Sequence, residues 1–141
     1  MISGGTMFAI LFAVLIIGIL IFLAILLTSK KVYSFNKDDY QTDFLVINNK
    51  LSKENPMSYN VVVVEADKLL DKALCEMGVQ GKTMGERMKR AGSKFTQLNS
   101  VWYAHKLRNQ IAHEHGFKVE YNQARHALET YKQALKDLGA I

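Results

Sequence analysis

The chain has 141 residues, a net charge of +5 and a single cysteine, Cys75. This length is enough for one small domain. One cysteine excludes an internal disulfide framework, which suits a reducing compartment, and Cys75 itself has the features of an ordinary small helix residue.

An unbroken apolar run over residues 7–27 predicts a transmembrane helix, because about 20 apolar residues span a bilayer. We therefore expect a single-pass anchor within residues 1–29. A secretory signal peptide is the competing interpretation. It is disfavoured because no basic residue precedes the run and no small-x-small cleavage site lies before Lys30. Lys30 and Lys31 follow the run, so the positive-inside rule places the rest of the chain in the cytoplasm, at the cell membrane.

Residues 30–55 are expected to form a juxtamembrane linker that contains one short amphipathic helix. This helix is predicted from about residue 38 to residue 51, and the polar segment 52–56 ends it. The compact domain is expected to begin after this segment and to cover residues 56–141.

Start and stop signals divide residues 56–141 into four helices. The first has Asn55 as N-cap, Pro56 at its first position and Gly78 after its end. Thr83 and Glu86 fit a capping box for a short helix that ends near residue 91. Two longer helices are expected over about residues 99–114 and 120–138, the last with a very regular apolar stripe.

No segment after residue 30 alternates with the period of two that is typical of a strand, and the chain has one proline. The soluble part is therefore predicted to be an all-α bundle of four or five helices. About 85 packed residues make a small core, so dimerisation would bury useful additional surface.

Three familiar motifs are incomplete in this chain. The sequence Gly81-Lys82-Thr83 resembles the end of a phosphate-binding P-loop, but Glu76 stands where that pattern requires glycine. The G-x-x-G sequence at 78–81 matches a nucleic-acid-binding loop that belongs to a fold with strands. His113 and His115 are two residues apart and diverge on a helix, and no ligand completes a set with them. We expect no metal and no cofactor.

Arg108 interrupts the apolar face of the helix over residues 99–114. It falls between Ala104 and Ala112 on a helical wheel. A buried, unpaired guanidinium is costly, so Arg108 requires a carboxylate partner or a place at a cleft or interface. Glu65 and Asp67, which flank the apolar stripe of the helix after Pro56, are the candidate partners.

The neighbouring flank of the same helix has groups suited to proton transfer. Asn109, His113 and Trp102 lie together there, and His105 lies between them and Arg108. A structural ion pair with a surface histidine is the simpler interpretation. The chemical one is that Arg108 binds phosphate while His113 exchanges a proton, which suits metal-free RNA cleavage. Five residues separate the two by about 140° on a helix, so a ligand lying across the helix or a second subunit would have to unite them.

The segment Arg108 to His113, "RNQIAH", resembles the R-x4–6-H motif of HEPN (higher eukaryotes and prokaryotes nucleotide-binding) domains. The wider stretch "EADKLLDKAL…GKTMGERMK…WYAHKLRNQIAHE" is similar to membrane-anchored bacterial proteins with such a domain, and the resemblance covers about residues 56–138. It implies a four- or five-helix bundle that often dimerises, with Arg108 and His113 as the catalytic pair of a metal-independent ribonuclease and Asn109 as the orienting residue. The anchor departs from the freely diffusing toxins of that family, and some members are binding modules without activity.

Seven basic residues and only one acidic residue lie between positions 82 and 108. Such a cluster suits a nucleic acid, an anionic lipid surface or simple solubility, and charge alone favours a solvated face. Apart from Arg108, these residues are the candidate RNA contacts: Lys82, Arg87, Lys89, Arg90, Lys94 and Lys106.

These observations leave three hypotheses open. The preferred one is a membrane-tethered, homodimeric ribonuclease with Arg108, His113 and Asn109 as catalytic residues, supported by His105, Glu65 and Asp67. The second is a non-catalytic HEPN-like module that binds RNA, a nucleotide or a protein partner such as an antitoxin. The third is a structural anchor whose amphipathic helices bind a partner helix or the inner leaflet, with the basic cluster contacting lipid.

Overall fold

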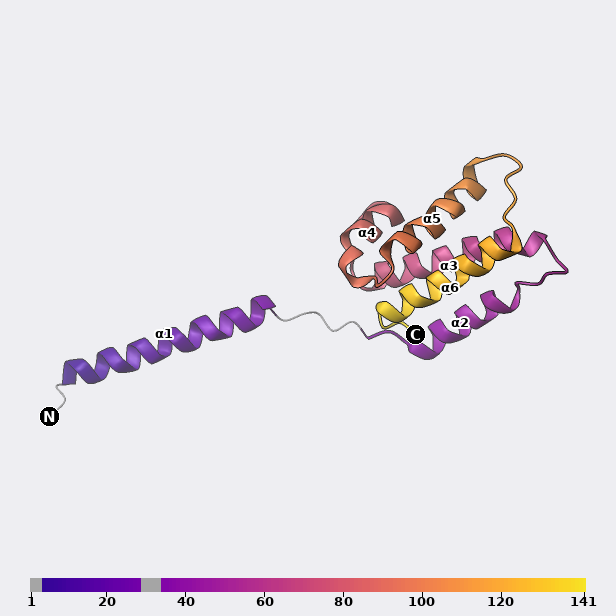
Figure 1. The fold of residues 1–141 in the computed structure, drawn as a ribbon. Helices are drawn as coiled ribbons and strands as arrows, with labels where there is room; N and C mark the ends of the chain where they lie inside the picture. Colours follow the sequence, from indigo (N-terminus) through magenta and orange to yellow (C-terminus); the bar gives the residue numbers. More distant parts are fainter. Residues whose placement is uncertain (1–3, 29–33) are drawn as a thin grey trace. The chain divides into compact units, whose positions relative to one another are not determined.

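The computed structural model describes residues 4–28 and 34–141, which contain six α-helices, one short 3-10 helix and no strand (Figure 1). The predicted all-α class is therefore confirmed for the described residues. The chain divides into two compact units, Met1–Val32 and Tyr33–Ile141. Each is described by itself below.

The first unit contains one helix, α1 (Gly4–Thr28), which has no charged residue. Its apolar segment Gly4–Leu27 is long enough to cross a membrane, and its large apolar side chains are exposed. A signal sequence near the N-terminus meets the same criteria of length and composition. Lys30 and Lys31, on which the expected orientation depends, lie outside the described residues.

The second unit is a helical bundle arranged around one central helix, α3 (Met57–Glu76). It contacts four other helices: α2 (Lys37–Asn49), α4 (Met84–Arg90), α5 (Leu98–His113) and α6 (Tyr121–Asp137) (Figure 1). The 3-10 helix η1 (Gly92–Lys94) connects α4 to the segment before α5. This arrangement makes α3 the element against which the others place their side chains.

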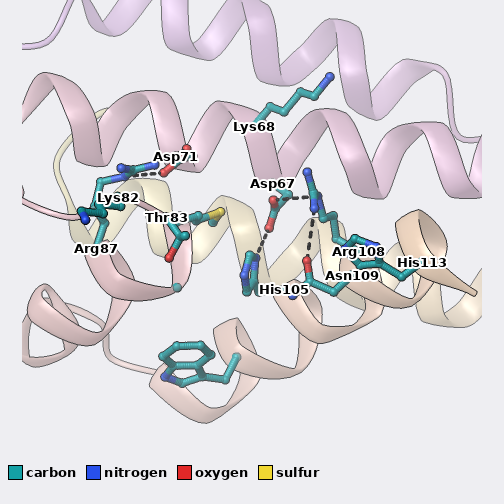
Figure 2. Close-up of a pocket in the computed structure, with 13 residues that line it drawn as sticks. Asp67, Lys68, Asp71, Lys82, Thr83, Arg87, His105, Arg108, Asn109 and His113 are labelled. Carbon is teal, nitrogen blue, oxygen red and sulfur yellow. Dashed lines mark hydrogen bonds and ion pairs between the residues drawn. The ribbon is translucent and has the colours of Figure 1, made fainter.

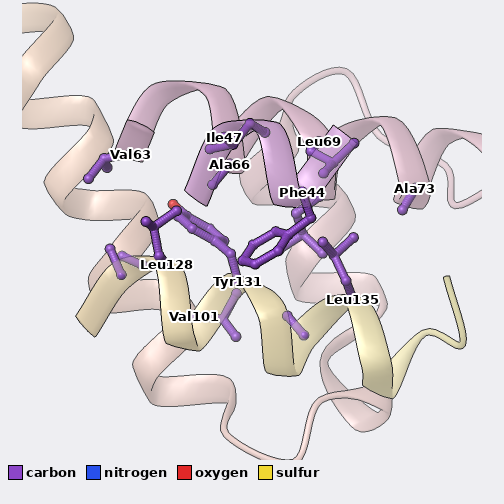
Figure 3. Close-up of a cluster of buried hydrophobic side chains, with 14 of the residues drawn as sticks. Phe44, Ile47, Val63, Ala66, Leu69, Ala73, Val101, Leu128, Tyr131 and Leu135 are labelled. Atoms are coloured by element: carbon purple, nitrogen blue, oxygen red, sulfur yellow. The ribbon is translucent and has the colours of Figure 1, made fainter. Parts of the chain in front are cut away.

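The core of the bundle consists of apolar residues that recur every three or four positions on the facing helices (Figure 3). Val63, Ala66 and Leu70 of α3 are completely buried, as are Tyr131 and Leu135 of α6. Burial of each valine or leucine side chain stabilises the fold by about 1.5–3 kcal/mol. The shared apolar seam therefore fixes α6 along α3. It thereby also fixes the polar residues that interrupt the two stripes.

Helix α2 packs into the bundle, so the compact unit extends beyond residues 56–141, over which the domain was expected. Tyr40, Phe44 and Ile47 are all buried against the core. Their spacing of four and then three residues places them on one face of α2, which packs against α3. This face would be exposed if residues 30–55 were a free linker. The compact unit accordingly begins near Tyr33.

The helix ends near the site agree with the predicted signals in part. Thr83 is the N-cap of α4 and accepts a hydrogen bond from the Glu86 amide at 3.2 Å. The Glu86 carboxylate accepts from the Lys82 amide instead of closing the box on Thr83. Gly78, with a φ of 71°, follows the end of α3 as expected. At the other end of α3, Pro56 takes the N-cap position predicted for Asn55.

Candidate functional site

A cavity of about 720 Å³ lies between α3, the start of α4 and α5 (Figure 2). It collects both the polar residues of α5 and the loop that precedes α4. Most of the residues that line it are charged or polar. They are Asp67, Lys68, Asp71, Lys82, Thr83, Met84, Gly85, Arg87, Trp102, His105, Arg108, Asn109 and His113.

Asp67 is the buried centre of the site, with 3% of its surface exposed. Its Oδ1 accepts a hydrogen bond from the Tyr131 hydroxyl at 2.9 Å and lies 2.8 Å from Nδ1 of His105. Its Oδ2 lies 3.4 Å from Nε of Arg108. A buried carboxylate is costly unless it is paired and hydrogen-bonded, so these three partners explain how α3 can hold an aspartate among its core residues.

Tyr131 supplies the deepest of these contacts. Burial, together with the neighbouring charge of Asp67, raises the pKa of the Tyr131 phenol well above its ordinary value. The hydroxyl therefore remains protonated and acts as a donor to the carboxylate. This bond ties the centre of α6 to the wall of the cavity.

Arg108 has the carboxylate partner that its sequence position required, and that partner is Asp67. Glu65 is not the partner, because it forms an ion pair with Lys50 at 2.7 Å. Two positions on a helix differ by about 200°, so Glu65 and Asp67 point to different faces of α3. The contact of Arg108 with Asp67 is ionic, since Nε is buried without a hydrogen-bond partner. Nη1 donates to the side chain of Asn109 at 3.1 Å.

His113, the last residue of α5, lines the same cavity as Arg108 within one chain. Figure 2 shows Arg108, Asn109 and His113 together at one end of the cavity. The five-residue spacing that separates Arg108 from His113 on the helix therefore does not require a second subunit to unite them. A broad cavity that runs along α5 can receive side chains from two flanks of the helix.

His105 and Trp102 also line the cavity. The carboxylate of Asp67 can only accept a hydrogen bond, so Nδ1–H of His105 is the donor. The rings of Trp102 and His105 meet edge to face at 6.2 Å. Trp102 keeps 36% of its surface exposed, and its ring forms part of the cavity wall.

Only two of the predicted RNA contacts line the cavity. Lys82 and Arg87 line the cavity at the end opposite to Arg108 (Figure 2). Arg87 is already engaged, because it binds both oxygens of Asp71 at 2.7 Å and donates to the Gly81 carbonyl at 2.6 Å. The hydrogen bonds with Asp71 raise the pKa of its guanidinium further. The other predicted contacts do not line this cavity: Lys89, Arg90, Lys94 and Lys106.

Several residues of the cavity were not among the predicted site residues. Lys68 and Asp71 are on the exposed edge of the α3 stripe, where charged residues are ordinary, so the sequence offered no signal for them. Gly85 offered none either, although it borders both aromatic rings of the site. Among the described residues, no group of three or more histidine, cysteine, aspartate or glutamate side chains is arranged to hold a metal ion.

No protein family, curated protein or solved structure gives a significant match to this chain. The cavity itself is therefore the guide to function. Its features are a fixed arginine, two histidines, one partly exposed tryptophan and a lysine at the far end. Cations and an aromatic ring in one cavity suit a ligand that has both phosphate and a flat base.

Proposed function

We propose that the chain is a membrane-tethered, HEPN-like protein that binds RNA in the cavity beside α5 and cleaves it without a metal ion. One observation carries this proposal: a single cavity holds Arg108, Asn109 and His113 together with Trp102 and Lys82. Arginine grips phosphate through its planar fork, histidine exchanges protons near neutral pH, and an aromatic ring stacks on a base.

The reaction that fits these groups is internal transesterification of RNA. The ribose 2′-oxygen loses its proton and bonds to the adjacent phosphorus, and the bond from phosphorus to the 5′-oxygen breaks. The products are a 2′,3′-cyclic phosphate and a 5′-hydroxyl end. Arg108 stabilises the negative charge that develops on the phosphate oxygens, and a histidine supplies the proton transfer.

The availability of the Arg108 guanidinium supports a role in phosphate binding. Its side chain is 30% exposed, and Nη2 makes no hydrogen bond to the residues that the structure describes. Asp67 and Asn109 hold the other side of the group. An arginine fixed in this way loses little side-chain entropy when a phosphate binds.

A second candidate function is a binding module without activity. It is favoured by the pairing of Arg108 with the buried Asp67, because such a pair also serves the fold alone. In this case the cavity binds RNA, a nucleotide or an acidic segment of a protein partner, and His113 has no chemical task.

We further propose that α1 anchors the domain in a membrane with the bundle on the cytoplasmic side. The length and apolar composition of Gly4–Leu27 support the anchor. A homodimer is also proposed, because Tyr103, which does not line the cavity, exposes apolar surface on α5 that a second copy would cover.

The test uses the full chain in detergent micelles with a labelled single-stranded RNA, in the presence and absence of EDTA. Cleavage that survives EDTA and leaves 2′,3′-cyclic phosphate ends is expected, and Arg108→Ala and His113→Ala should abolish it. His115→Ala is the matched control, since His115 is exposed and does not line the cavity. Equal cleavage by wild type and both active-site variants would contradict the proposal. RNA binding without cleavage would favour the binding module.

A further inference from the structure

The hydrogen bonds of the two histidines in the cavity differ. His105 is mostly buried, with 12% of its side chain exposed, and its Nδ1 lies 2.8 Å from the buried Asp67. His113 is exposed at the end of α5, and no hydrogen bond from its ring to the described residues is found. A general base must be held in a fixed position, and of the two histidines in the cavity only His105 is held by a hydrogen bond to the described residues.

We propose that His105 is the general base of the RNA cleavage proposed above, and that Asp67 and Tyr131 are its positioning residues. This inference rests on the proposed ribonuclease function. Asp67 accepts from Nδ1, which leaves Nε2 as the proton acceptor, as carboxylates do for histidine in hydrolase triads. Tyr131 donates to the same carboxylate oxygen at 2.9 Å and so holds Asp67 in place.

The position of Nε2 agrees with this role. A Cβ built on Gly85 would lie 3.9 Å from Nε2 of His105 and 3.8 Å from the ring of Trp102. Gly85 lines the cavity, so the absence of a side chain there leaves room for about one methyl group beside Nε2. A base stacked on Trp102 would bring its ribose close to this space.

Arg108 is also better placed relative to His105 than to His113. Residues three apart are neighbours on a helix surface, whereas residues five apart diverge. His105 and Arg108 both contact Asp67, so one carboxylate holds the base and the phosphate-binding group together. Their shared partner accounts for the fixed geometry that in-line attack on phosphorus requires.

The reaction also needs a general acid, and we assign this role to His113. Nε2 of His105 removes the proton of the 2′-hydroxyl as the new bond to phosphorus forms. The leaving 5′-oxygen takes a proton from the His113 imidazolium, because His113 lines the same cavity. His105 then returns its proton to water and His113 regains one, so both groups end as they began.

A pair of substrates separates the two roles. An RNA dinucleotide has an alkoxide leaving group that requires an acid, whereas uridine 3′-(4-nitrophenyl phosphate) releases 4-nitrophenolate, which does not. With the full chain in micelles, His113→Ala should lose roughly 10²-fold or more on the dinucleotide and recover nearly the wild-type rate on the nitrophenyl ester. His105→Ala should lose roughly 10²-fold or more on both substrates.

His105→Gln, whose amide can still donate to Asp67, keeps the test valid if His105→Ala does not fold. Recovery of His105→Gln, but not of His113→Ala, on the nitrophenyl ester would assign the base to His113 and overturn this inference. Full activity of a folded His105 variant would also overturn it while leaving the ribonuclease function intact. Failure of the wild type to cleave either substrate would instead contradict the proposed function.

The tautomer of His105 gives a readout that is independent of activity. In ¹⁵N spectra of histidine-labelled full-length protein at pH 8, the His105 signal should show a proton on Nδ1 and a bare Nε2. Asp67→Asn should change this tautomer ratio, while His115→Ala leaves it unchanged. A proton on Nε2 in the wild type would refute the assignment, because the ring would then be unable to accept one there.

Discussion

Gly85 lies beside His105: a Cβ atom added to Gly85 would be 3.9 Å from Nε2 of the histidine. That distance is an ordinary van der Waals contact, so a methyl group fits there without displacing a neighbour. The backbone of α4 therefore leaves room for about one methyl group beside the histidine. A substitution at Gly85 can therefore change the stability of the fold and the access to His105 in opposite directions.

Gly85→Ala should stabilise the fold and impair the reaction. Alanine in a helix is favoured over glycine by up to about 0.5–1 kcal/mol, with less expected in this first turn of α4. The added methyl group should hinder the approach of a ribose to Nε2 and lower kcat/KM for RNA. Thermal unfolding and initial-rate measurements on the same preparation check both effects. Gly92→Ala, which lies outside the cavity and meets only the side chain of Leu98, is the control and should leave the rate unchanged.

Asp67→Asn should destabilise the bundle by about 2–4 kcal/mol, because it leaves Arg108 without its countercharge and weakens the bonds to Tyr131 and His105. Urea unfolding followed by circular dichroism measures this change. The control is Glu65→Gln, which removes an exposed pair with Lys50 and should cost less than about 1 kcal/mol. Equal losses of unfolding free energy in the two variants would show that the contacts of Asp67 stabilise the fold no more than an exposed ion pair does.

Trp102 should report ligand binding directly, because it is the single tryptophan of the chain and lines the cavity. Titration with a short single-stranded RNA should quench its fluorescence as a base stacks on the indole ring. Trp102→Ala should weaken binding by about 1–3 kcal/mol, and Trp102→Phe should retain most of the affinity. Fluorescence anisotropy of labelled RNA measures the variants, and unchanged affinity in Trp102→Ala would exclude stacking at this position.

Asp137 should make the free energy of unfolding of the bundle decrease at acidic pH. Burial acts to raise the pKa of its carboxyl, but hydrogen bonds from Thr96 and Gln133 outweigh burial and lower this pKa below its ordinary value. A lowered pKa in the folded state means that the contribution is complete above the unfolded pKa of about 3.9 and is lost as the pH falls through the folded value.

Asp137→Asn should therefore cost up to about 1 kcal/mol at pH 7, because solvent screens this partly exposed carboxylate, and the difference from wild type should shrink below about pH 4. Urea unfolding at several pH values checks this dependence. Glu129→Gln, at an exposed site on the same helix, should show almost no pH-dependent difference. A difference that stays constant down to pH 2 would contradict the assigned cause.

The amino-acid sequence by itself determined the helices and the anomaly on α5. Apolar spacing and end signals such as Thr83 and Gly78 act within one or two turns, so helix type and approximate ends follow from neighbouring residues. The requirement that Arg108 have a carboxylate partner also follows locally, because an arginine on an apolar face must be compensated wherever it folds.

Only the tertiary structure decided which partners these residues take. Asp67 meets His105 and Tyr131 from positions 38 and 64 residues away, and Arg87 meets Asp71 across 16 residues. The inclusion of α2 in the bundle likewise depends on its contact with α3. Sequence periodicity shows which face of a helix is buried, but not which other helix packs against that face. Packing around α3 makes that choice, and with it places His105 and Arg108 on the same carboxylate.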